Sequence, residues 1–482
     1  MLFNSFEFLV FFPIMIIGYY LLNHKHRWLW LLLGSYYFYM VHQPELAILL
    51  FISTTVDYFC ALKMAHARQS MKKLYLCISI LVNIGILFSF KYLSFFTSSI
   101  QDVLAFFGIA ISETQNTGAY SFNQILIPVG ISFYTFQTLG YSIDVYRGHI
   151  KPEKHFGYFA LYVSFFPQLV AGPIERASRL IPQLKTLATV NLDNIKKGLV
   201  LIAWGFFLKV VVADRLGVYV DAAFEDPEFN HGLPLFIGSF FFAYQIYYDF
   251  SAYTAIAIGA AKVMGIDLVQ NFNRPYFSTS ISDFWKRWHI SLMDWLKDYI
   301  FIPLGGSRGS KLKIIRNVLI LFFVVGLWHG ANWTFVIWGI INAILLIIEF
   351  STNGIRKRIF KALKLPQIAI NILGWCAIVV LLSIPLIFFR SPSVADAILY
   401  FKNMFNITGL HVNILNNYFE LFLCFALMIA VQTIHYFKGN DKIYELVISK
   451  STPIRWSIYM CYVLTIVLFA INRQNTFIYF QF

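Results

Sequence analysis

The sequence has few charged residues. Charged side chains make up only 13% of the 482 residues, whereas hydrophobic ones make up 59%. A water-soluble protein carries about 25% charged residues. With so little charge and a mean hydropathy of +0.65, the composition excludes a soluble globular chain and a disordered chain, and it is typical of a membrane protein.

Cysteine is also scarce, and it is not arranged for chemistry. The five cysteines lie in apolar surroundings, without a Cys-x-x-Cys pair and without a histidine at ligand spacing: Cys60, Cys77, Cys376, Cys424 and Cys461. This pattern argues against a disulfide framework, a zinc site and a cysteine nucleophile. We predict no metal centre.

The positive charge is scattered through short loops. The formal net charge is +14, but the basic residues are spread over segments such as 63–73, 308–316 and 356–364. Membrane proteins carry such residues in their cytoplasmic loops, so topology explains them. We therefore expect the lipid bilayer as a partner and no nucleic acid.

Apolar runs of roughly 20 residues recur, the length that a helix needs to cross about 30 Å of hydrocarbon. The runs are continuous, unlike the alternating pattern of barrel strands. The sequence thus predicts an all-α, polytopic integral membrane protein with about 11 transmembrane helices and added re-entrant or interfacial helices near 100–111 and 124–146. The expected spans lie near residues 6–22, 28–40, 44–62, 74–96, 156–171, 198–220, 234–262, 317–349, 367–389, 416–437 and 454–471.

The first apolar run does not resemble a removable signal peptide, because it carries Glu7 and has no basic flank before it. Basic residues at 24–27 follow it, so the positive-inside tendency places the N-terminus outside and this loop in the cytoplasm. No repeat, low-complexity tract or Pro/Gly-rich linker divides the chain. We expect one membrane domain over residues 1–482.

One stretch, from Ser282 to Tyr299, breaks the apolar pattern. With the rotation of about 100° per residue of an α-helix, the pattern predicts an amphipathic helix with Ser282 as its N-cap. This helix is too charged to cross lipid. Aromatic and apolar residues share one face, and charged residues share the other. The first face holds Trp285, Trp288, His289, Leu292, Trp295, Leu296 and Tyr299, and the second holds Asp283, Lys286, Arg287, Asp294, Lys297 and Asp298. Taken alone, this pattern indicates a membrane-surface anchor.

His329 and Asp249 are ionisable residues that lie inside apolar segments. His329 stands in GLWHGANW, residues 326–333, near the start of a long apolar run, and Asp249 stands in the run from 234 to 262. A polar group at membrane depth is costly unless it is partnered or functional. The alternative for His329 is a packing role, with Gly326 and Gly330 allowing close helix approach.

A glycine-rich cationic loop follows the amphipathic stretch. It runs from Gly305 to Lys311 and is followed by Lys313 and Arg316. It has no Walker pattern, so contact with donor phosphates and an ordinary positive cytoplasmic loop are both open interpretations.

Four motifs, in one chain and in this order, resemble the membrane-bound O-acyltransferase family. They are LIPVGISFYTFQ at 126–137, PQLVAGPI at 167–174, WKRWHISL at 285–292 and GLWHGA at 326–331. The opening MLFNS and the closing FIYFQF at 477–482 are most similar to the bacterial alginate O-acetyltransferase branch. The resemblance covers essentially the whole chain.

This resemblance implies transmembrane helices around a central passage, with a catalytic core over approximately 126–350. It implies that His329 is the essential residue and that His289 belongs to the same site. An acyl thioester such as acetyl-CoA would be the cytoplasmic donor, without a bound cofactor. The product would be an O-acetylated extracytoplasmic polysaccharide, such as an alginate-like exopolysaccharide or a cell-wall glycan, reached directly or through a periplasmic acetyltransferase or carrier protein. The location would be the bacterial inner membrane.

The chemistry of acyl transfer suits these residues. A hydroxyl acceptor needs a base near neutral pH, and a neutral imidazole is the usual one. We assign His329 as the general base and His289 as a second polar group that orients substrate or stabilises charge. Candidate donor contacts are Lys286, Arg287, Arg308, Lys311 and Lys313, with Asp249 as a supporting polar residue.

The chain departs from the family after Asp249. It reads Phe-Ser-Ala-Tyr-Thr-Ala at 250–255, where the family pattern continues with a glycine and a second acid. A role for that second acid is therefore not expected here. A non-catalytic export or assembly subunit, or a transporter, remains an alternative function, although the inverted repeats typical of transporters are absent from the sequence.

Overall fold

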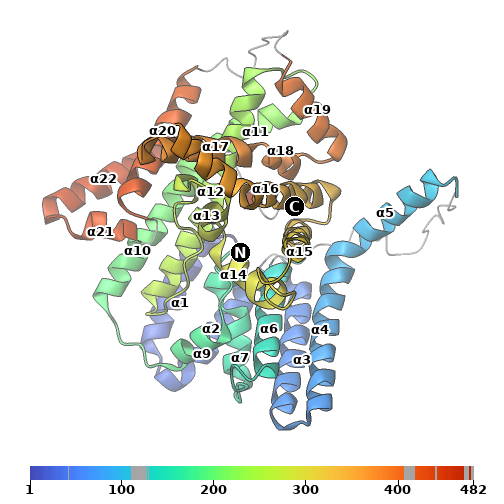
Figure 1. Cartoon of the computed structure of the whole chain (residues 1–482). Coiled ribbons are helices and arrows are strands. Elements are labelled where there is room, and N and C mark those ends of the chain that lie inside the picture. Colours follow the sequence, from blue (N-terminus) through green and yellow to red (C-terminus); the bar gives the residue numbers. More distant parts are fainter. Residues whose placement is uncertain are drawn as a thin grey trace. The chain divides into compact units, whose positions relative to one another are not determined.

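The structure is a computed structural model, and it describes residues 1–41, 43–109, 128, 130–406, 418–439, 442–471 and 477–478. Within these ranges the regular structure consists of helices and includes no strand, which confirms the all-α prediction. The chain folds into two compact units, one of residues 5–190 with Met1 and one of residues 191–482 with residues 2–4 (Figure 1). The single domain over 1–482 and the core over 126–350 stay predictions.

The first unit consists of helices α1 to α9. Their bounds are α1 (Phe6–Leu21), α2 (His24–Met40), α3 (Ala47–His66), α4 (Gln69–Leu87), α5 (Leu93–Phe106), α6 (Ile131–Tyr146), α7 (Phe156–Ser164), α8 (Phe166–Leu169) and α9 (Ala177–Lys185). Residues 126, 127 and 129 of the motif at 126–137 lie outside the described residues.

A buried carboxylate joins three helices of this unit, α3, α4 and α6, which pack side by side (Figure 1). Asp57 is 0% exposed. Its oxygens accept hydrogen bonds from Ser79 Oγ at 2.5 Å, from Asn83 Nδ2 at 2.8 and 3.0 Å, and from Ser142 Oγ at 3.3 Å. A buried charge is tolerated only when its hydrogen-bonding capacity is filled in this way. Asp57 is an isolated acid in the apolar run at 44–62, but its partners are not recognisable from the sequence.

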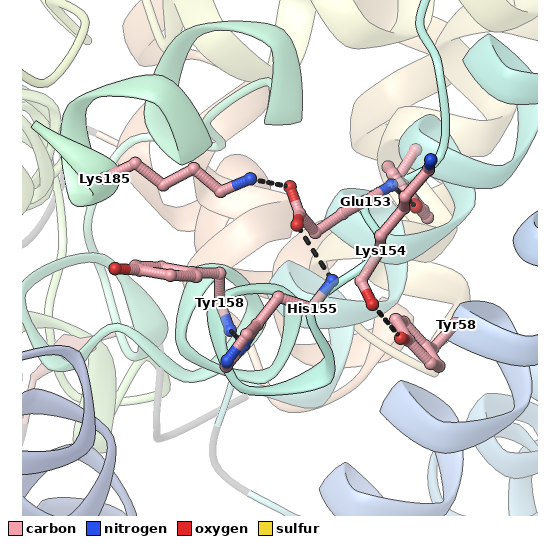
Figure 2. Close-up of polar contacts among 7 residues, drawn as sticks. Tyr58, Glu153, Lys154, His155, Tyr158 and Lys185 are labelled. Atoms are coloured by element: carbon pink, nitrogen blue, oxygen red, sulfur yellow. Dashed lines mark hydrogen bonds and ion pairs between the residues drawn. The ribbon is translucent and has the colours of Figure 1, made fainter. Parts of the chain in front are cut away.

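Polar contacts also hold the loop between α6 and α7 (Figure 2). The carboxylate of Glu153 accepts hydrogen bonds from the backbone N of His155 at 2.9 Å and from Lys185 Nζ in α9 at 2.5 Å. The hydroxyl of Tyr58 in α3 donates to the carbonyl of Lys154 at 2.5 Å. These contacts fix the loop to two other helices of the same unit.

The second unit contains His289 and His329, the histidines of the motifs at 285–292 and 326–331. Its helices are α10 (Leu192–Phe207), α11 (Asp214–Glu225), α12 (Leu233–Val263), α13 (Ile281–Arg287), α14 (Ile290–Leu296), α15 (Lys311–His329), α16 (Trp333–Ala362), α17 (Gln367–Ser383), α18 (Pro385–Arg390), α19 (Val394–Met404), α20 (Tyr418–Phe437), α21 (Ile443–Ile448) and α22 (Thr452–Phe469). A π-helical turn at Leu208–Ala213 joins α10 to α11.

Seven helical segments of the described residues are long and apolar enough to cross a membrane. They are Pro44–His66, Gln69–Phe106, Lys311–His329, Trp333–Ala362, Gln367–Arg390, Tyr418–Phe437 and Thr452–Phe469. The protein is therefore a multi-pass membrane protein, whereas about 11 spans stays a prediction from helix length. The apolar run at 317–349 corresponds to two helices, α15 and α16, which pack against each other.

Candidate active site

The helix predicted over residues 282–299 is broken at His289. Helix α13 ends at Arg287, and His289 has left-handed backbone angles of φ 44° and ψ 53° before α14 begins at Ile290. The prediction of one continuous helix is therefore wrong. Periodicity cannot reveal such a break, because a left-handed residue is stabilised by contacts with distant parts of the chain.

A neighbouring segment supplies those contacts. The backbone N of Asn273 donates to the carbonyl of Arg287 at 2.9 Å, and the backbone N of Ile290 donates to the carbonyl of Asn271 at 2.9 Å. The carbonyl of Arg287 and the N–H of Ile290 lose their helical partners at the break, and these two hydrogen bonds replace them. Buried backbone groups need such partners. The segment at 271–273 therefore fixes the position of His289.

The predicted N-cap is also wrong by two residues. Ser280 precedes α13, and its side chain accepts a hydrogen bond from Asp283 N. The hydroxyl of Ser282 instead donates to Glu349 of α16 at 2.6 Å. A preceding serine with extended backbone is the usual cap, so the helix starts two residues earlier than the sequence indicated.

The two-faced character of this stretch survives the break. Trp285, Trp288 and Trp295 are buried, at 6%, 5% and 5% exposure. Lys286 and Lys297 on the other face are exposed. The predicted separation of an aromatic face from a charged face is confirmed.

The imidazole of His289 is enclosed, and a hydrogen bond with Asn271 orients it. The side chain is 1% exposed, and its Nδ1 atom lies 3.0 Å from Asn271 Oδ1. That oxygen also accepts from Ser291 Oγ at 2.9 Å and from Ser291 N at 3.4 Å. Because Ser291 N can only donate, the acceptor identity of the Asn271 oxygen is fixed, and His289 Nδ1 carries the hydrogen.

This arrangement keeps His289 neutral. A neutral imidazole with hydrogen on Nδ1 has its lone pair on Nε2. Burial lowers the pKa of His289 from 6.5 to about 3, since removal from water disfavours the charged form. The rings of Phe250 and Trp328 lie 4.7 and 5.5 Å from the imidazole, centroid to centroid.

His329 lies at the end of a helix. It is the last residue of α15, followed by Gly330 with extended backbone, and it is 5% exposed. Its ring contacts Trp328, Trp338 and Phe389, with centroid distances of 4.9, 5.0 and 5.2 Å. The predicted close approach at the glycines is present, since a Cβ atom on Gly326 would lie 2.5 Å from the carbonyl oxygen of Phe335 in α16.

The structure brings the two histidines to one tryptophan. The indole of Trp328 contacts His289 at an interplanar angle of 75° and His329 at an angle of 83°. Both imidazoles are buried in the same unit of the protein. Residues from two separate motifs therefore meet in one aromatic-walled region.

Asp249 belongs to a buried ion cluster beside this region. Its Oδ1 atom lies 2.7 Å from Lys209 Nζ, which also lies 2.9 Å from Asp214 Oδ1. The next residue, Phe250, is the one that packs against His289. Lys209 was not among the predicted site residues, although a lysine inside the apolar run at 198–220 is a signal that the sequence contains.

The same carboxylate holds a segment from the end of the chain. Asp249 Oδ2 accepts a hydrogen bond from the backbone N of Ile478 at 2.8 Å. Phe477 is 0% exposed and packs against Phe250 and Tyr253, at 5.6 and 4.3 Å. Asp249 is thus bonded to backbone and to lysine, and residues 479–482 of the closing motif lie outside the described residues.

The predicted donor contacts lie at the surface. Arg308, Lys311 and Lys313 are exposed, and so is Lys286. Arg287 forms an ion pair with Asp283 at 3.0 Å. Lys311 begins α15 and His329 ends it, so the rise of a helix places them about 27 Å apart. Only a donor with an extended arm reaches both. No group of three or more metal-ligating side chains was found within the described ranges.

Comparison with known proteins shows to which family the chain belongs. The profile of MBOAT, the membrane-bound O-acyltransferase family, matches residues 149–390. This chain belongs to that family. It is therefore a multi-pass membrane acyltransferase.

Its relatives cover most of its length. The chain is 35% identical to the probable alginate O-acetylase AlgI of Pseudomonas aeruginosa over 431 residues, which are 86% of this chain and 79% of that protein. It is 33% identical to the peptidoglycan O-acetyltransferase of Helicobacter pylori over 443 residues, 85% of this chain and 80% of that one. It is also 30% identical to the teichoic acid D-alanyltransferase of Bacillus subtilis over 230 residues, 45% of this chain and 58% of that one.

Proposed function

We propose that this membrane acyltransferase passes an acetyl group from a cytoplasmic thioester, such as acetyl-CoA, across the inner membrane for O-acetylation of an extracytoplasmic polysaccharide. The observation that carries this proposal is the meeting of His289 and His329 at Trp328, in a chain of this family. The names of the alginate and peptidoglycan relatives support acetyl transfer to a polysaccharide.

In this proposal His329 is the general base. It takes the proton of the acceptor hydroxyl while the oxygen attacks the thioester carbonyl. The tetrahedral intermediate then expels the thiolate, which is protonated as the acetyl ester is released. The acceptor is either a sugar hydroxyl or a hydroxyl of a carrier or periplasmic acetyltransferase that completes the transfer.

His289 has a different role. A useful base has a pKa near the working pH, and burial holds the pKa of His289 at about 3. A ring that stays neutral suits the orientation of a substrate. The hydrogen bond with Asn271 supports this assignment, because it leaves Nε2 of His289 as the acceptor.

The outer parts of the site follow from topology. Lys286, Arg287, Arg308, Lys311 and Lys313 are proposed to meet the phosphates of the donor on the cytoplasmic side, where positive loops concentrate. The N-terminus is then extracytoplasmic. Asp249 supports the site through Phe250 rather than by contact with substrate.

The test uses the purified full-length chain in sealed proteoliposomes, with acetyl-CoA labelled in the acetyl group added on one side. We expect labelled ester on a polysaccharide acceptor, alginate or peptidoglycan oligosaccharide, on the opposite side when a matching periplasmic acetyltransferase is present. Transport of intact acceptor without ester formation would instead support a transporter. No thioester consumption with any acceptor would support a non-catalytic assembly subunit.

A further inference from the structure

A pocket lies on the surface of the helix pair α15 and α16, beside the start of α13. Its volume is about 530 Å³. Both helices are long and apolar enough to span a membrane. Neither histidine lines it.

The walls of this pocket combine polar and apolar side chains. The polar ones include Ser282, Ser307 and Arg356, and the apolar ones include Ile315, Leu346 and Phe350, here named the groove. This mixture suits an amphiphile with a polar head and a hydrocarbon tail. A soluble metabolite would not need the apolar part.

The acid in the pocket is already engaged. The carboxylate of Glu349 accepts hydrogen bonds from the backbone N atoms of Ile281 and Ser282, at 2.5 and 3.2 Å, and from Ser282 Oγ at 2.6 Å. It therefore caps the start of α13, and its negative charge is compensated there.

The guanidinium of Arg356 retains donors for a ligand. One of its terminal nitrogens donates to the backbone carbonyl of Glu349 at 3.1 Å. Its Nε atom is buried and has no hydrogen-bond partner within the described part of the chain. A planar guanidinium with open donors is suited to a phosphate.

The surrounding charge favours an anion. Between residues 305 and 364 the chain has nine basic residues and one acid, Glu349. Such an excess marks the cytoplasmic side of a membrane protein. Anionic lipids are concentrated in that leaflet, and basic pockets between transmembrane helices bind their headgroups.

We propose that this pocket binds an anionic phospholipid, with its phosphate at Arg356 and an acyl chain along Ile315, Leu346 and Phe350. The lipid bridges α15 to α16 and covers Glu349 at the start of α13. Since α13 leads directly to His289 and α15 ends at His329, lipid composition would then influence both helices of the candidate site. The binding itself does not depend on the proposed acetyl transfer.

The test is native mass spectrometry of the delipidated full-length protein in detergent, titrated with phosphatidylglycerol or with zwitterionic phosphatidylcholine. We expect one tightly held phosphatidylglycerol and no comparable phosphatidylcholine. Arg356→Gln should bind phosphatidylglycerol about fivefold more weakly, the effect of one basic residue at an anionic surface. Leu346→Trp, which fills the groove, should remove the bound lipid.

The matched control is Lys357→Gln, which removes the same charge from an exposed neighbour in α16. It should bind as the unaltered protein does. Equal losses in Arg356→Gln and Lys357→Gln would overturn the proposal, as would equal binding of both lipids. Displacement by coenzyme A would assign the pocket to the acyl donor, and equal binding of free glycerol phosphate would assign it to a soluble phosphate; each result overturns a lipid site. These measurements involve no acyl transfer, so their failure is distinct from a failure of the proposed function.

Discussion

The Nδ1 atom of His289 and the Oδ1 atom of Asn271 are 3.0 Å apart, in a site where both side chains are buried. Asn271 also accepts from the backbone of Ser291, in the first turn of α14. One amide oxygen therefore sets the tautomer of the imidazole and the start of the following helix. The pair connects the backbone break at His289 to its chemistry.

We predict that Asn271→Leu lowers the acetyl-transfer rate by about tenfold, because the buried Nδ1–H of His289 loses its acceptor. Asn271→Asp should restore part of the rate, since a carboxylate accepts the same hydrogen. Its negative charge would also raise the pKa of His289 and shift the pH profile of the rate. Rates of ester formation measured across pH for the three proteins check this. A pH profile of Asn271→Asp identical to that of the unaltered protein would count against the assigned contact.

The buried imidazole also predicts how stability depends on pH. The pKa of His289 is about 3 in the folded protein, against an ordinary value of 6.5. Below about pH 6.5, His289 therefore binds a proton in the unfolded chain but not in the folded protein. The free energy of unfolding falls as the pH falls toward about 3. Between about pH 6.5 and about pH 5 the loss is about 2 kcal/mol. In detergent, the melting temperature of the unaltered protein should fall more steeply with decreasing pH than that of His289→Gln. Parallel curves of melting temperature against pH for the two proteins would refute the prediction.

The sequence could predict the elements whose signal is local. Long apolar runs indicate helices whatever surrounds them, and the faces of residues 282–299 follow from periodicity alone. The residues of the candidate site came from two motifs, and the structure brings these motifs together at Trp328. No local pattern could predict the break at His289, because the break depends on hydrogen bonds to residues 271–273.

The sequence also did not identify the partners of buried polar residues. Asn271 has no distinguishing neighbour in the sequence, and its role depends on a fold that returns it to His289. Between Lys209 and Asp249 lie the whole of α11 and about the first half of α12, so their ion pair is a tertiary contact. An isolated charge in an apolar run predicts that a partner exists but does not identify it.

The ion cluster around Lys209 yields a prediction on folding. Lys209→Met would leave Asp214 and Asp249 buried without their cation, which costs about 3–5 kcal/mol. We expect little monodisperse protein after extraction. Asp249→Asn should be milder, because the amide oxygen still accepts from Ile478.

Lys262→Met is the matched control, since Lys262 pairs with Asp267, whose side chain is 59% exposed. The loss of this surface pair should change stability by about 1 kcal/mol or less. Size-exclusion profiles and melting temperatures distinguish the cases. If Lys209→Met melted as Lys262→Met does, the cluster would not be a structural requirement.

The cationic loop before α15 is testable through its dependence on salt. Combined replacement of Arg308, Lys311 and Lys313 by Glu should raise the KM for the thioester donor about tenfold, because three exposed charges are reversed near its phosphates. For the unaltered protein, added salt should raise the donor KM, since salt screens such contacts. The control reverses Lys357, Lys361 and Lys364, which are exposed in the last turns of α16 and just after it. An equal rise in KM in both triple variants would assign the effect to net charge rather than to this loop.

The assignment of His329 as general base leads to the most decisive prediction. His329→Ala should lower acetylation per folded molecule by about 10² to 10⁴, the usual contribution of a general base. His329→Gln should be equally inactive, because an amide forms hydrogen bonds but does not take a proton at neutral pH. A purely packing role predicts the opposite pattern. The cavity left by alanine would then reduce the amount of folded protein and spare the turnover of the remainder, and glutamine would restore part of the yield.

The control for His329 is a second buried histidine of the same unit. His435 is 0% exposed, its Nδ1 atom lies 3.4 Å from the hydroxyl of Tyr247, and its ring contacts Trp204 and Tyr247 at 5.9 and 5.8 Å. His435→Ala removes the same ring from a similarly aromatic setting, so it measures the cost of the cavity alone. The assay is the acetyl content of the product, divided by the amount of protein that elutes as a single folded species. Because the base and the packing role differ in turnover per molecule rather than in yield, near-normal turnover in His329→Ala would return the histidine of GLWHGANW to a packing role between its tryptophans.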